Sequence, residues 1–168
     1  MVEIREAVES DAAEIVHLGA LMYKSVGAKP TPQWALESTR IVKERLGKDL
    51  IGFVIDAPEG GLASCALVNI EPRLPRPGRH SALVAYIQWV STAPQHYRKG
   101  YAKALMAALL EETDRRGIEV IELHATQSGR HLYDELGFFE KTDNVAMQAL
   151  RGSAASEREH GSSGKGRR

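Results

Sequence analysis

Several features that define whole classes of protein are scarce or missing in this sequence. Cys65 is its one cysteine, which excludes an intramolecular disulfide and a cysteine-rich zinc site and fits a reducing compartment. No apolar run approaches the roughly 20 residues that span a bilayer. The first residues, MVEIREAVESDAAEI, lack the basic and apolar regions of a signal peptide. We therefore expect a cytoplasmic protein with no membrane partner and no metal.

The sequence also lacks net charge, since 22 Lys and Arg side chains balance 22 Asp and Glu side chains. Segment 151–168 holds five of the basic and two of the acidic ones, so the rest of the chain is slightly acidic. A domain that binds nucleic acid normally carries a basic patch. The composition therefore argues against a nucleic-acid partner.

The length and the apolar content predict one globular domain. The 168 residues, 43% of them hydrophobic, suffice for one buried core and would be cramped as two independent domains. We assign this domain to residues 1–150. Residues 151–168 replace core residue types with Ser, Gly and charge, so we expect a disordered tail there.

Hydrophobic periodicity predicts a mixed α/β fold. The expected strands cover 2–7, 49–56, 62–70, 81–92 and 118–125, and the expected helices run from Ser10 or Asp11 to Gly27 and over 33–46, 99–116 and 129–136. Strands 49–56 and 62–70 should pair as a hairpin, and the proline-rich 71–80 should be a loop. The unit 81–125 should be a right-handed crossover between two parallel strands, and 138–150 a closing hairpin or pair of strands.

The start of the predicted helix 99–116 departs from ordinary helix chemistry. It offers Tyr97, Arg98, Lys99 and Gly100 where an acidic or hydroxyl cap is usual, and so adds positive charge to a positive dipole end. Backbone N–H groups at a helix N-terminus bind phosphate oxygens, Gly100 lets the chain approach closely, and Ala102 keeps the first turn clear. The turn therefore suits a pyrophosphate, and the alternative is a solvated basic turn with a convenient glycine.

Two segments in order resemble the Gcn5-related N-acetyltransferases, the GNAT superfamily. VSTAPQHYRKGYAKALM contains Tyr97-x-x-Gly100-x-Ala102, which is similar to the family's acetyl-CoA signature Gln/Arg-x-x-Gly-x-Gly/Ala. GRHLYDELGF contains Leu132–Phe138, which is similar to the family's LYEKLGF element. The resemblance covers roughly residues 2–150 and implies the GNAT fold, a central mixed β-sheet with splayed parallel strands flanked by helices.

The resemblance also implies acetyl-CoA as cosubstrate. The pantetheine arm would lie between the two splayed strands, WVST and ELHA, and the pyrophosphate would lie on the amides of HYRKGYA. The implied cofactor-binding residues are Val90, Ser91, Thr92, Tyr97, Arg98, Lys99, Gly100, Tyr101, Ala102 and Thr126. Two of them depart from the family's pattern, because Tyr97 replaces the usual Gln or Arg and Thr126 replaces a frequent asparagine.

The family's chemistry assigns the role of general acid to Tyr133, because a phenol with a pKa near 10 stays protonated at neutral pH and can protonate a leaving thiolate. The alternative is a core tyrosine. A backbone N–H near Ser91 would stabilise the oxyanion. The general base is not identified, since no Asp or Glu lies between Ser81 and Ala93. His124 titrates in the right range, yet a lone histidine is more often structural.

The resulting interpretation is a GNAT-type N-acyltransferase that acetylates an amine, preferably of a small molecule, by direct attack. A peptide or protein amine is the next choice of acceptor. The acceptor would approach near segments 27–34 and 139–144, where Glu140 and Asp143 could attract a cation or simply be solvated. A GNAT-fold sensor that binds acetyl-CoA without catalysis and an unrelated nucleotide-binding domain remain as alternatives.

The sequence does not determine the oligomeric state. Homodimers are common in the family, so a homodimer is an expectation by analogy alone. The two tryptophans, Trp34 and Trp89, could contribute to an interface, although large aromatic side chains more often belong to the core.

Overall fold

The computed structural model describes residues 2–142 and 147–151. The chain divides into two compact units, Met1–Ser128 and Gly129–Arg168, and each is described by itself below. Of the predicted disordered tail, all but Arg151 lies outside the described residues.

The first unit contains every strand of the described chain. Its elements are β1 (Arg5–Glu6), a 3₁₀ turn (Glu9–Asp11), α1 (Ala12–Ser25), α2 (Pro32–Arg45), β2 (Leu50–Asp56), β3 (Leu62–Pro72), β4 (Leu83–Thr92), a second 3₁₀ turn (Pro94–His96), α3 (Tyr101–Arg115) and β5 (Val120–Glu122). The second unit contains α4 (Arg130–Glu135).

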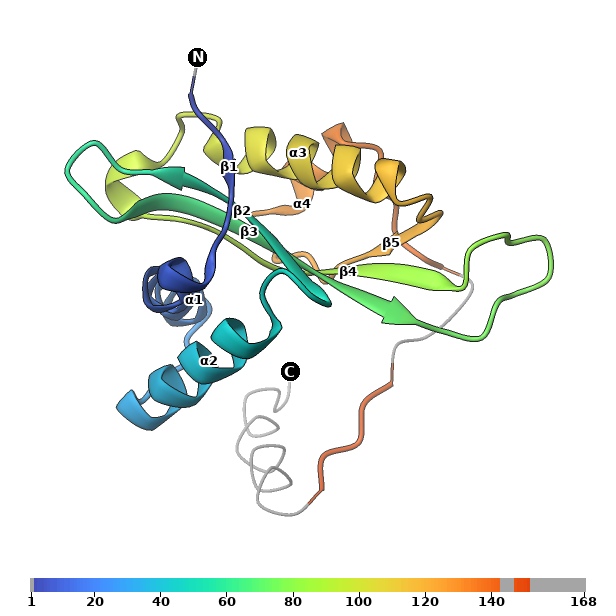
Figure 1. Cartoon of the computed structure of the whole chain (residues 1–168), viewed down its shortest axis with the longest axis horizontal. Coiled ribbons are helices and arrows are strands. Elements are labelled where there is room, and N and C mark those ends of the chain that lie inside the picture. Colours follow the sequence, from blue (N-terminus) through green and yellow to red (C-terminus); the bar gives the residue numbers. More distant parts are fainter. Residues whose placement is uncertain (1, 143–146, 152–168) are drawn as a thin grey trace, which may run out of the picture. The chain divides into compact units, whose positions relative to one another are not determined.

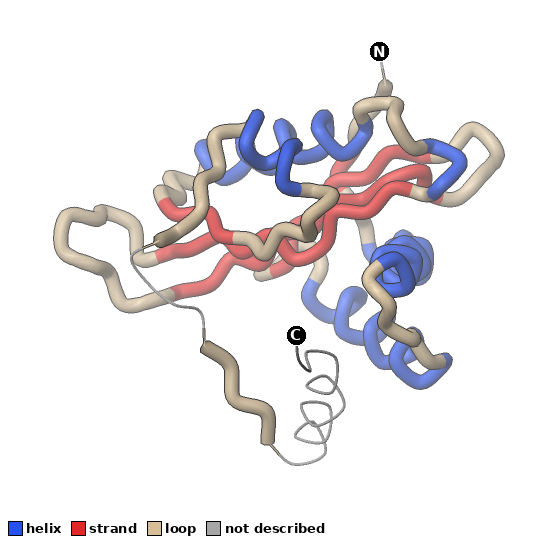
Figure 2. The backbone as a smooth tube through the Cα atoms, turned by 180° about the vertical axis from the view of Figure 1, so that it is seen from behind, coloured by secondary structure: helices blue, strands red, loops and turns tan. Residues whose placement is uncertain are grey.

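The five strands form one mixed sheet in the order β1-β2-β3-β4-β5. All neighbours pair antiparallel except β4 and β5, which are parallel. Helices α1 and α2 lie on one side of the sheet and α3 on the other (Figure 1), and the strands form a layer between them when seen from behind (Figure 2). The predicted hairpin, the parallel pair and the mixed α/β class are therefore confirmed.

The core on the α1 side is built around Trp89 of β4. Its side chain packs so closely on α1 that a Cβ added to Gly19 would lie 2.7 Å from its Cζ3 atom. The rings of Tyr23 and Trp34 lie 6.1 and 6.0 Å from its ring. Trp89 is buried and Trp34 is half-buried in this core, so both tryptophans pack internally in the described unit.

The opposite face of the sheet is covered by α3, whose Leu105, Met106 and Leu109 are fully buried. Because both faces are covered, β3 reads as a nearly continuous apolar run. Cys65 lies in the middle of that strand with no exposed surface. Burial raises the pKa of its thiol to about 12, so Cys65 is a small core residue, as its flanks indicate.

Two predicted strand regions differ from the structure. The expected strand 118–125 is paired only over Val120–Glu122. The described residues of 138–150 form no strand, so the predicted closing hairpin is wrong for 138–142 and 147–150, and residues 143–146 lie outside the described part. A strand needs a hydrogen-bonded neighbour and a face to bury, whereas Phe139 and Met147 are 88% and 92% exposed.

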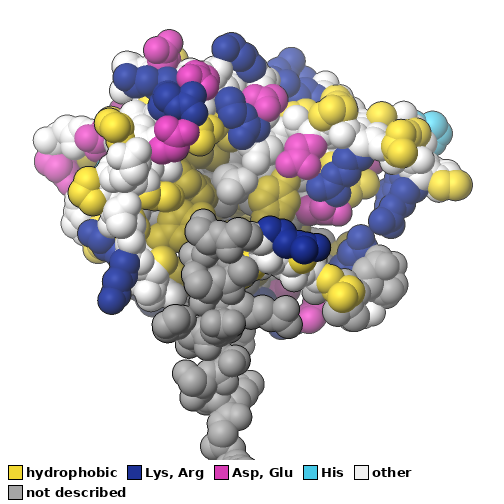
Figure 3. Space-filling view, turned by 90° about the horizontal axis from the view of Figure 1, so that it is seen from below, with side chains coloured by type: hydrophobic (Ala, Val, Ile, Leu, Met, Phe, Trp, Pro, Cys, Tyr) yellow, Lys and Arg dark blue, Asp and Glu magenta, His cyan; other side chains and the backbone are white. Residues whose placement is uncertain are grey.

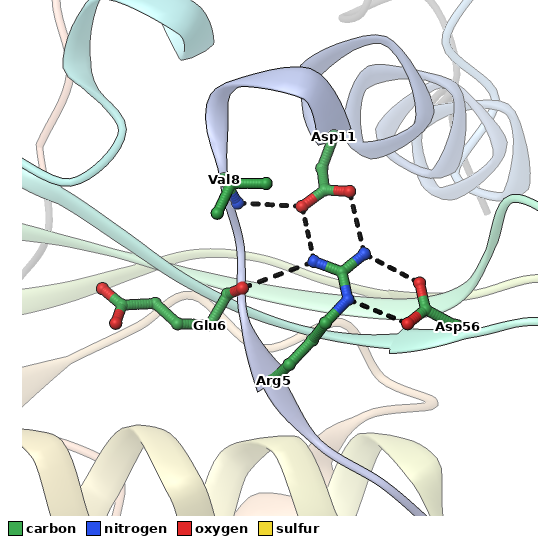
Figure 4. Close-up of polar contacts among 5 residues, drawn as sticks. All are labelled: Arg5, Glu6, Val8, Asp11 and Asp56. Carbon is green, nitrogen blue, oxygen red and sulfur yellow. Dashed lines mark hydrogen bonds and ion pairs between the residues drawn. The ribbon is translucent and has the colours of Figure 1, made fainter.

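The start of α1 is tied to the sheet by the guanidinium of Arg5 (Figure 4). Its nitrogens donate two bonds to Asp56 on β2, at 2.7 and 2.8 Å, and two to Asp11, at 2.8 and 2.9 Å. Asp11 also accepts from the backbone N–H of Val8 at 2.8 Å. The bonds from Arg5 are the main reason that the pKa of Asp11 is lowered. One arginine therefore connects β1, β2 and the beginning of α1.

We expect the substitution Asp11→Ala to lower the free energy of unfolding by about 1.5–3 kcal/mol at pH 7, since charge-assisted hydrogen bonds to a largely buried carboxylate are lost. A depressed carboxyl pKa stabilises the fold above the unfolded-state pKa, so the loss should shrink as the pH falls below about 4. Urea denaturation at pH 7 and at pH 3.5 measures both effects.

The matched control is Glu37→Ala on α2, which removes a carboxylate that is paired with Arg40 on the exposed surface. Its effect at pH 7 should be much smaller. Equal losses in the two variants would show that the Arg5 cluster does not stabilise the fold.

Candidate active site

A bulge interrupts the pairing of β4 with β3. Leu67 of β3 lies opposite Trp89 and Val68 opposite Ile87, which leaves Gln88 as an extra residue in β4. Such a bulge bends and twists its strand. On the other side of β4, pairing with β5 ends where Tyr86 faces Glu122. Residues 87–92 therefore have no strand partner on the β5 side within the described chain.

The register shows which backbone groups of β4 face this open edge. Ala93 donates its N–H to the carbonyl of Ala63 at 2.8 Å. Hydrogen-bonded pairs alternate along an antiparallel ladder, so the Ser91 and Cys65 pair is also of this kind. Val90 and Thr92 fall between these pairs, and their N–H and C=O groups turn away from β3 toward the open edge.

The backbone of Ser91 does not face the open edge, although the sequence resemblance places Ser91 among the cofactor-binding residues. Its peptide groups face β3, and its carbonyl also accepts from the Ser64 hydroxyl at 2.9 Å. Its own hydroxyl donates to the carbonyl of Leu18 on α1 at 2.7 Å. Ser91 thus fixes β4 beneath α1, while Val90 and Thr92 present the free backbone.

The predicted phosphate turn follows β4 directly. Arg98 has φ +61°, the one positive φ of a non-glycine residue in the described chain, and Gly100 has φ +77°. No side chain of the described residues caps α3, whose first helical bond runs from the N–H of Ala104 to the carbonyl of Gly100. The first amides of the helix, including those of Tyr101 and Ala102, precede that bond and lack helical partners.

The side chain of Lys99 turns back from this helix end. Its Nζ lies 3.1 Å from Nδ1 of His96, whose Nε2 lies 2.8 Å from Oε1 of Glu59 on the β2–β3 turn. The ring of Tyr101 stacks on the His96 ring at 6.0 Å. His96 is buried, while Tyr97 is exposed. Sequence reasoning missed Glu59 and His96, because no spacing signal connects residues 37 positions apart.

The two residues predicted on the β5 side lie in the loop that follows that strand. Nδ1 of His124 lies 2.6 Å from the hydroxyl of Tyr86, whose pKa is raised chiefly by burial. This contact favours the structural interpretation of His124. Thr126 is exposed, and its Oγ1 lies 3.2 Å from the hydroxyl of Ser128.

Tyr133 lies on α4 in the second unit and is half-buried. Its ring contacts Phe138 at 5.8 Å, and its carbonyl accepts from the Phe138 N–H at 3.0 Å. Its hydroxyl has no hydrogen-bond partner among the described residues. Burial raises the pKa of this phenol, so it is protonated at neutral pH. In the same unit Glu140 pairs with Arg130 at 3.1 Å, and Asp143 lies outside the described residues.

The described part of the chain offers neither a metal site nor a membrane-spanning helix. Within residues 2–142 and 147–151, His, Cys, Asp and Glu side chains do not gather in groups of three or more that could hold a metal ion. Over the same residues, none of the helices combines the length and the apolar character needed to cross a membrane.

The geometry defines a mixed α/β domain in which an open strand edge leads into an uncapped helix N-terminus. The family of acetyltransferase (GNAT) domains matches residues 3–140, and the chain belongs to this family. It is 27% identical to the uncharacterized N-acetyltransferase YycN of Bacillus subtilis, over 70% of this chain and 79% of that one.

Solved structures share the fold. A predicted acetyltransferase from Clostridium acetobutylicum, solved with acetyl-CoA, has a TM-score of 0.78 and 21% identity over 88% of this chain and 96% of that one. Glucosamine-6-phosphate N-acetyltransferase from Arabidopsis thaliana has a TM-score of 0.66 and 19% identity over 89% and 98%.

The positive φ of Arg98 predicts opposite results for two substitutions that remove the same charge. Arg98→Gly should leave the free energy of unfolding unchanged or slightly higher, because glycine adopts this conformation without strain. Arg98→Val should lower it by about 1 kcal/mol or more, because a β-branched residue is strongly disfavoured at positive φ. Urea denaturation distinguishes them, and equal stabilities would show that the backbone at Arg98 is not strained.

Proposed function

We propose that this protein is an acetyl-CoA-dependent N-acetyltransferase that acetylates a primary amine of a small molecule. The observation that carries the proposal is the continuity of the open β4 edge, at Val90 and Thr92, with the uncapped N-terminus of α3. An extended ligand that carries amides followed by a pyrophosphate would match the β4 edge with its amides and the α3 N-terminus with its pyrophosphate. Acetyl-CoA carries these groups in this order.

In the proposed complex the pantetheine amides pair with the backbone of Val90 and Thr92. The pyrophosphate accepts from the amides of the turn and of the first residues of α3, which run from Tyr97 to Ala102. Arg98 adds an exposed positive charge beside it. Lys99, which contacts His96, holds the shape of the turn. Thr126, in place of the family's asparagine, is a further contact to the cosubstrate.

The proposed reaction is direct attack of the neutral amine on the thioester carbonyl. A C–N bond forms, a tetrahedral oxyanion develops, and the C–S bond then breaks. The N–H of Val90 is better placed than that of Ser91 to donate a hydrogen bond to the oxyanion, because the register turns the Ser91 peptide toward β3. Tyr133 donates its proton to the departing thiolate, the amine proton passes to water, and water then returns a proton to the Tyr133 phenolate. The raised pKa of Tyr133 keeps its phenol protonated for this step.

The acceptor class is proposed from the family. The similar protein from Arabidopsis thaliana is named for acetylating glucosamine-6-phosphate, a small amine. The family match spans residues 3–140, which supports treating residues 1–150 as one functional domain. A protein that binds acetyl-CoA without transfer would not need Tyr133 as an acid, so turnover that depends on this residue separates the two functions.

Calorimetric titration with acetyl-CoA and, separately, with ATP tests the cosubstrate. We expect saturable binding of acetyl-CoA and weaker binding of ATP, since ATP lacks the pantetheine arm that would pair with β4. Arg98→Gly should weaken acetyl-CoA binding several-fold while leaving the fold intact. Preference for ATP, or absence of acetyl-CoA binding, would contradict the proposal.

Tyr133→Phe tests the acid. We expect kcat to fall by about 10²–10⁴-fold, the usual contribution of general acid catalysis, with acetyl-CoA affinity unchanged. Because the pKa of Tyr133 is raised, wild-type kcat should show no loss from ionisation of the acid between pH 7 and pH 9. Steady-state kinetics with an excess of amine measures both, and an unaltered kcat in the phenylalanine variant would remove Tyr133 from this role.

A further inference from the structure

A cleft lies between α2 and the face of the sheet that α2 overhangs. Its volume is about 180 Å³, which is small beside the roughly 300–1,000 Å³ of sites for drug-sized ligands. Side chains of α2 and of the sheet form its apolar walls, and four side chains form its polar lining. The apolar lining residues are Ile41, Val42, Leu50, Leu67 and Trp89, and the polar ones are Ser38, Arg45, Asn69 and Gln88.

The polar side chains form an ordered chain of hydrogen bonds. Arg45 donates to Asp49 at 2.8 Å and to Oδ1 of Asn69 at 3.1 Å. A guanidinium can only donate, which fixes the orientation of the Asn69 amide. Nδ2 of Asn69 then donates to Oε1 of Gln88 at 2.8 Å, and this bond fixes the Gln88 amide in turn.

This order leaves hydrogen-bond donors on the cleft side of the network. Nη1 of Arg45 and Nε2 of Gln88 have no protein partner among the described residues, and both side chains reach the surface, whereas the oxygen of each amide already accepts one hydrogen bond. Apart from the Ser38 hydroxyl, which can donate or accept, the polar lining therefore offers more free donors than free acceptors. A ligand group that accepts hydrogen bonds complements it.

The indole of Trp89 also lines the cleft, although its Nε1 lies beneath the accessible surface. Its side chain lines the cleft and is 8% exposed, and its Nε1 is a buried donor without a partner among the described residues. The Cζ3 and Cε3 edge of the indole faces Gly19 on α1, so Nε1 lies on the edge directed away from α1. A ligand in the cleft would therefore contact the Trp89 ring and not its N–H.

The cleft adjoins the proposed site of acetyl transfer along β4. Gln88 and Trp89 line it, and the next residue, Val90, turns its backbone to the open edge. We propose that this cleft binds the acceptor, and that the acceptor is a primary amine joined by an apolar spacer to a carboxylate. The inference rests on the proposed function and adds the class of its substrate.

Each part of this ligand follows from one part of the cleft. The carboxylate meets the free donors of Arg45 and Gln88. A single guanidinium that already shares its charge with Asp49 suits a monoanion better than a phosphate dianion. The spacer lies on the apolar walls of the cleft. Apolar side chains are exposed between charged ones on one face of the molecule (Figure 3). The amine must lie beyond the spacer, because it has to reach the thioester.

The test compares four amines of equal chain length with acetyl-CoA as donor. We expect kcat/KM for 6-aminohexanoate to exceed that for hexylamine, 6-aminohexanamide and 2-aminohexanoate by at least tenfold. Hexylamine lacks the carboxylate, the amide lacks its charge, and 2-aminohexanoate is an isomer with the amine beside the carboxylate. An equal or higher value for any of the three would overturn the proposed class.

The variant Arg45→Met removes the guanidinium and keeps the aliphatic stem. It should lower kcat/KM for 6-aminohexanoate about tenfold, mainly through KM, while hexylamine turnover and acetyl-CoA affinity stay unchanged. Arg40→Met is the matched control on the same helix, because Arg40 pairs with Glu37 and Glu44 and does not line the cleft. No change in Arg45→Met, or the same loss in both variants, would overturn the assignment.

A binding measurement separates this proposal from the function on which it rests. Titration of 6-aminohexanoate without acetyl-CoA should change the tryptophan fluorescence saturably, since Trp89 lines the cleft, and Arg45→Met should abolish that change. Calorimetry with acetyl-CoA independently tests the proposed function. A saturable fluorescence change without acetyl-CoA binding would contradict the proposed transferase function and support ligand binding in the cleft. Acetyl-CoA binding without the fluorescence change would support the cosubstrate and contradict ligand binding in the cleft.

Discussion

The early end of hydrogen bonding between β4 and β5 is the constraint on which the rest of the site depends. Two parallel strands pair only while they stay near 4.8 Å apart. The bulge at Gln88 bends β4 two residues after Tyr86, its last partner for β5. Backbone groups at Val90 and Thr92 are then left without a strand partner on the β5 side, although backbone donors and acceptors inside a protein are normally satisfied. That unmet requirement makes the edge a natural place for a ligand that carries amides.

The other side of β4 is held rigidly, which gives this open edge a fixed position. Trp89 packs on Gly19, and the Ser91 hydroxyl bonds to the carbonyl of Leu18, so α1 contacts alternate residues of the strand. Arg5 in turn holds the beginning of α1 to β2 through Asp11 and Asp56. One short segment of β4 therefore serves three purposes, since it anchors α1, lines the cleft under α2 and presents free backbone toward β5.

Much of the fold could be predicted from the sequence, because periodicity, turns and helix ends are local properties of the chain. The hairpin, the crossover and α3 with its glycine-bearing turn are examples. The strand prediction was wrong in extent for 118–125 and wrong in kind for the described residues of 138–150, since a strand exists only where another strand is available to pair. For the site, the turn at Gly100 could be predicted, whereas Glu59 beneath His96 could not. That contact joins segments 37 residues apart and leaves no pattern in either.

The sequence by itself determined the order of elements, the core-facing stripes of the helices, the basic turn before α3 and the two segments that resemble a known family. These are properties of residues close together in the chain. Tertiary structure alone decided that Val90 and Thr92 face the open edge while Ser91 does not, because the direction of a peptide group depends on the partner strand and on one extra residue at Gln88. It also decided that Arg45, Asn69 and Gln88 form one hydrogen-bonded row, since a helix and two strands must pack before those side chains can meet.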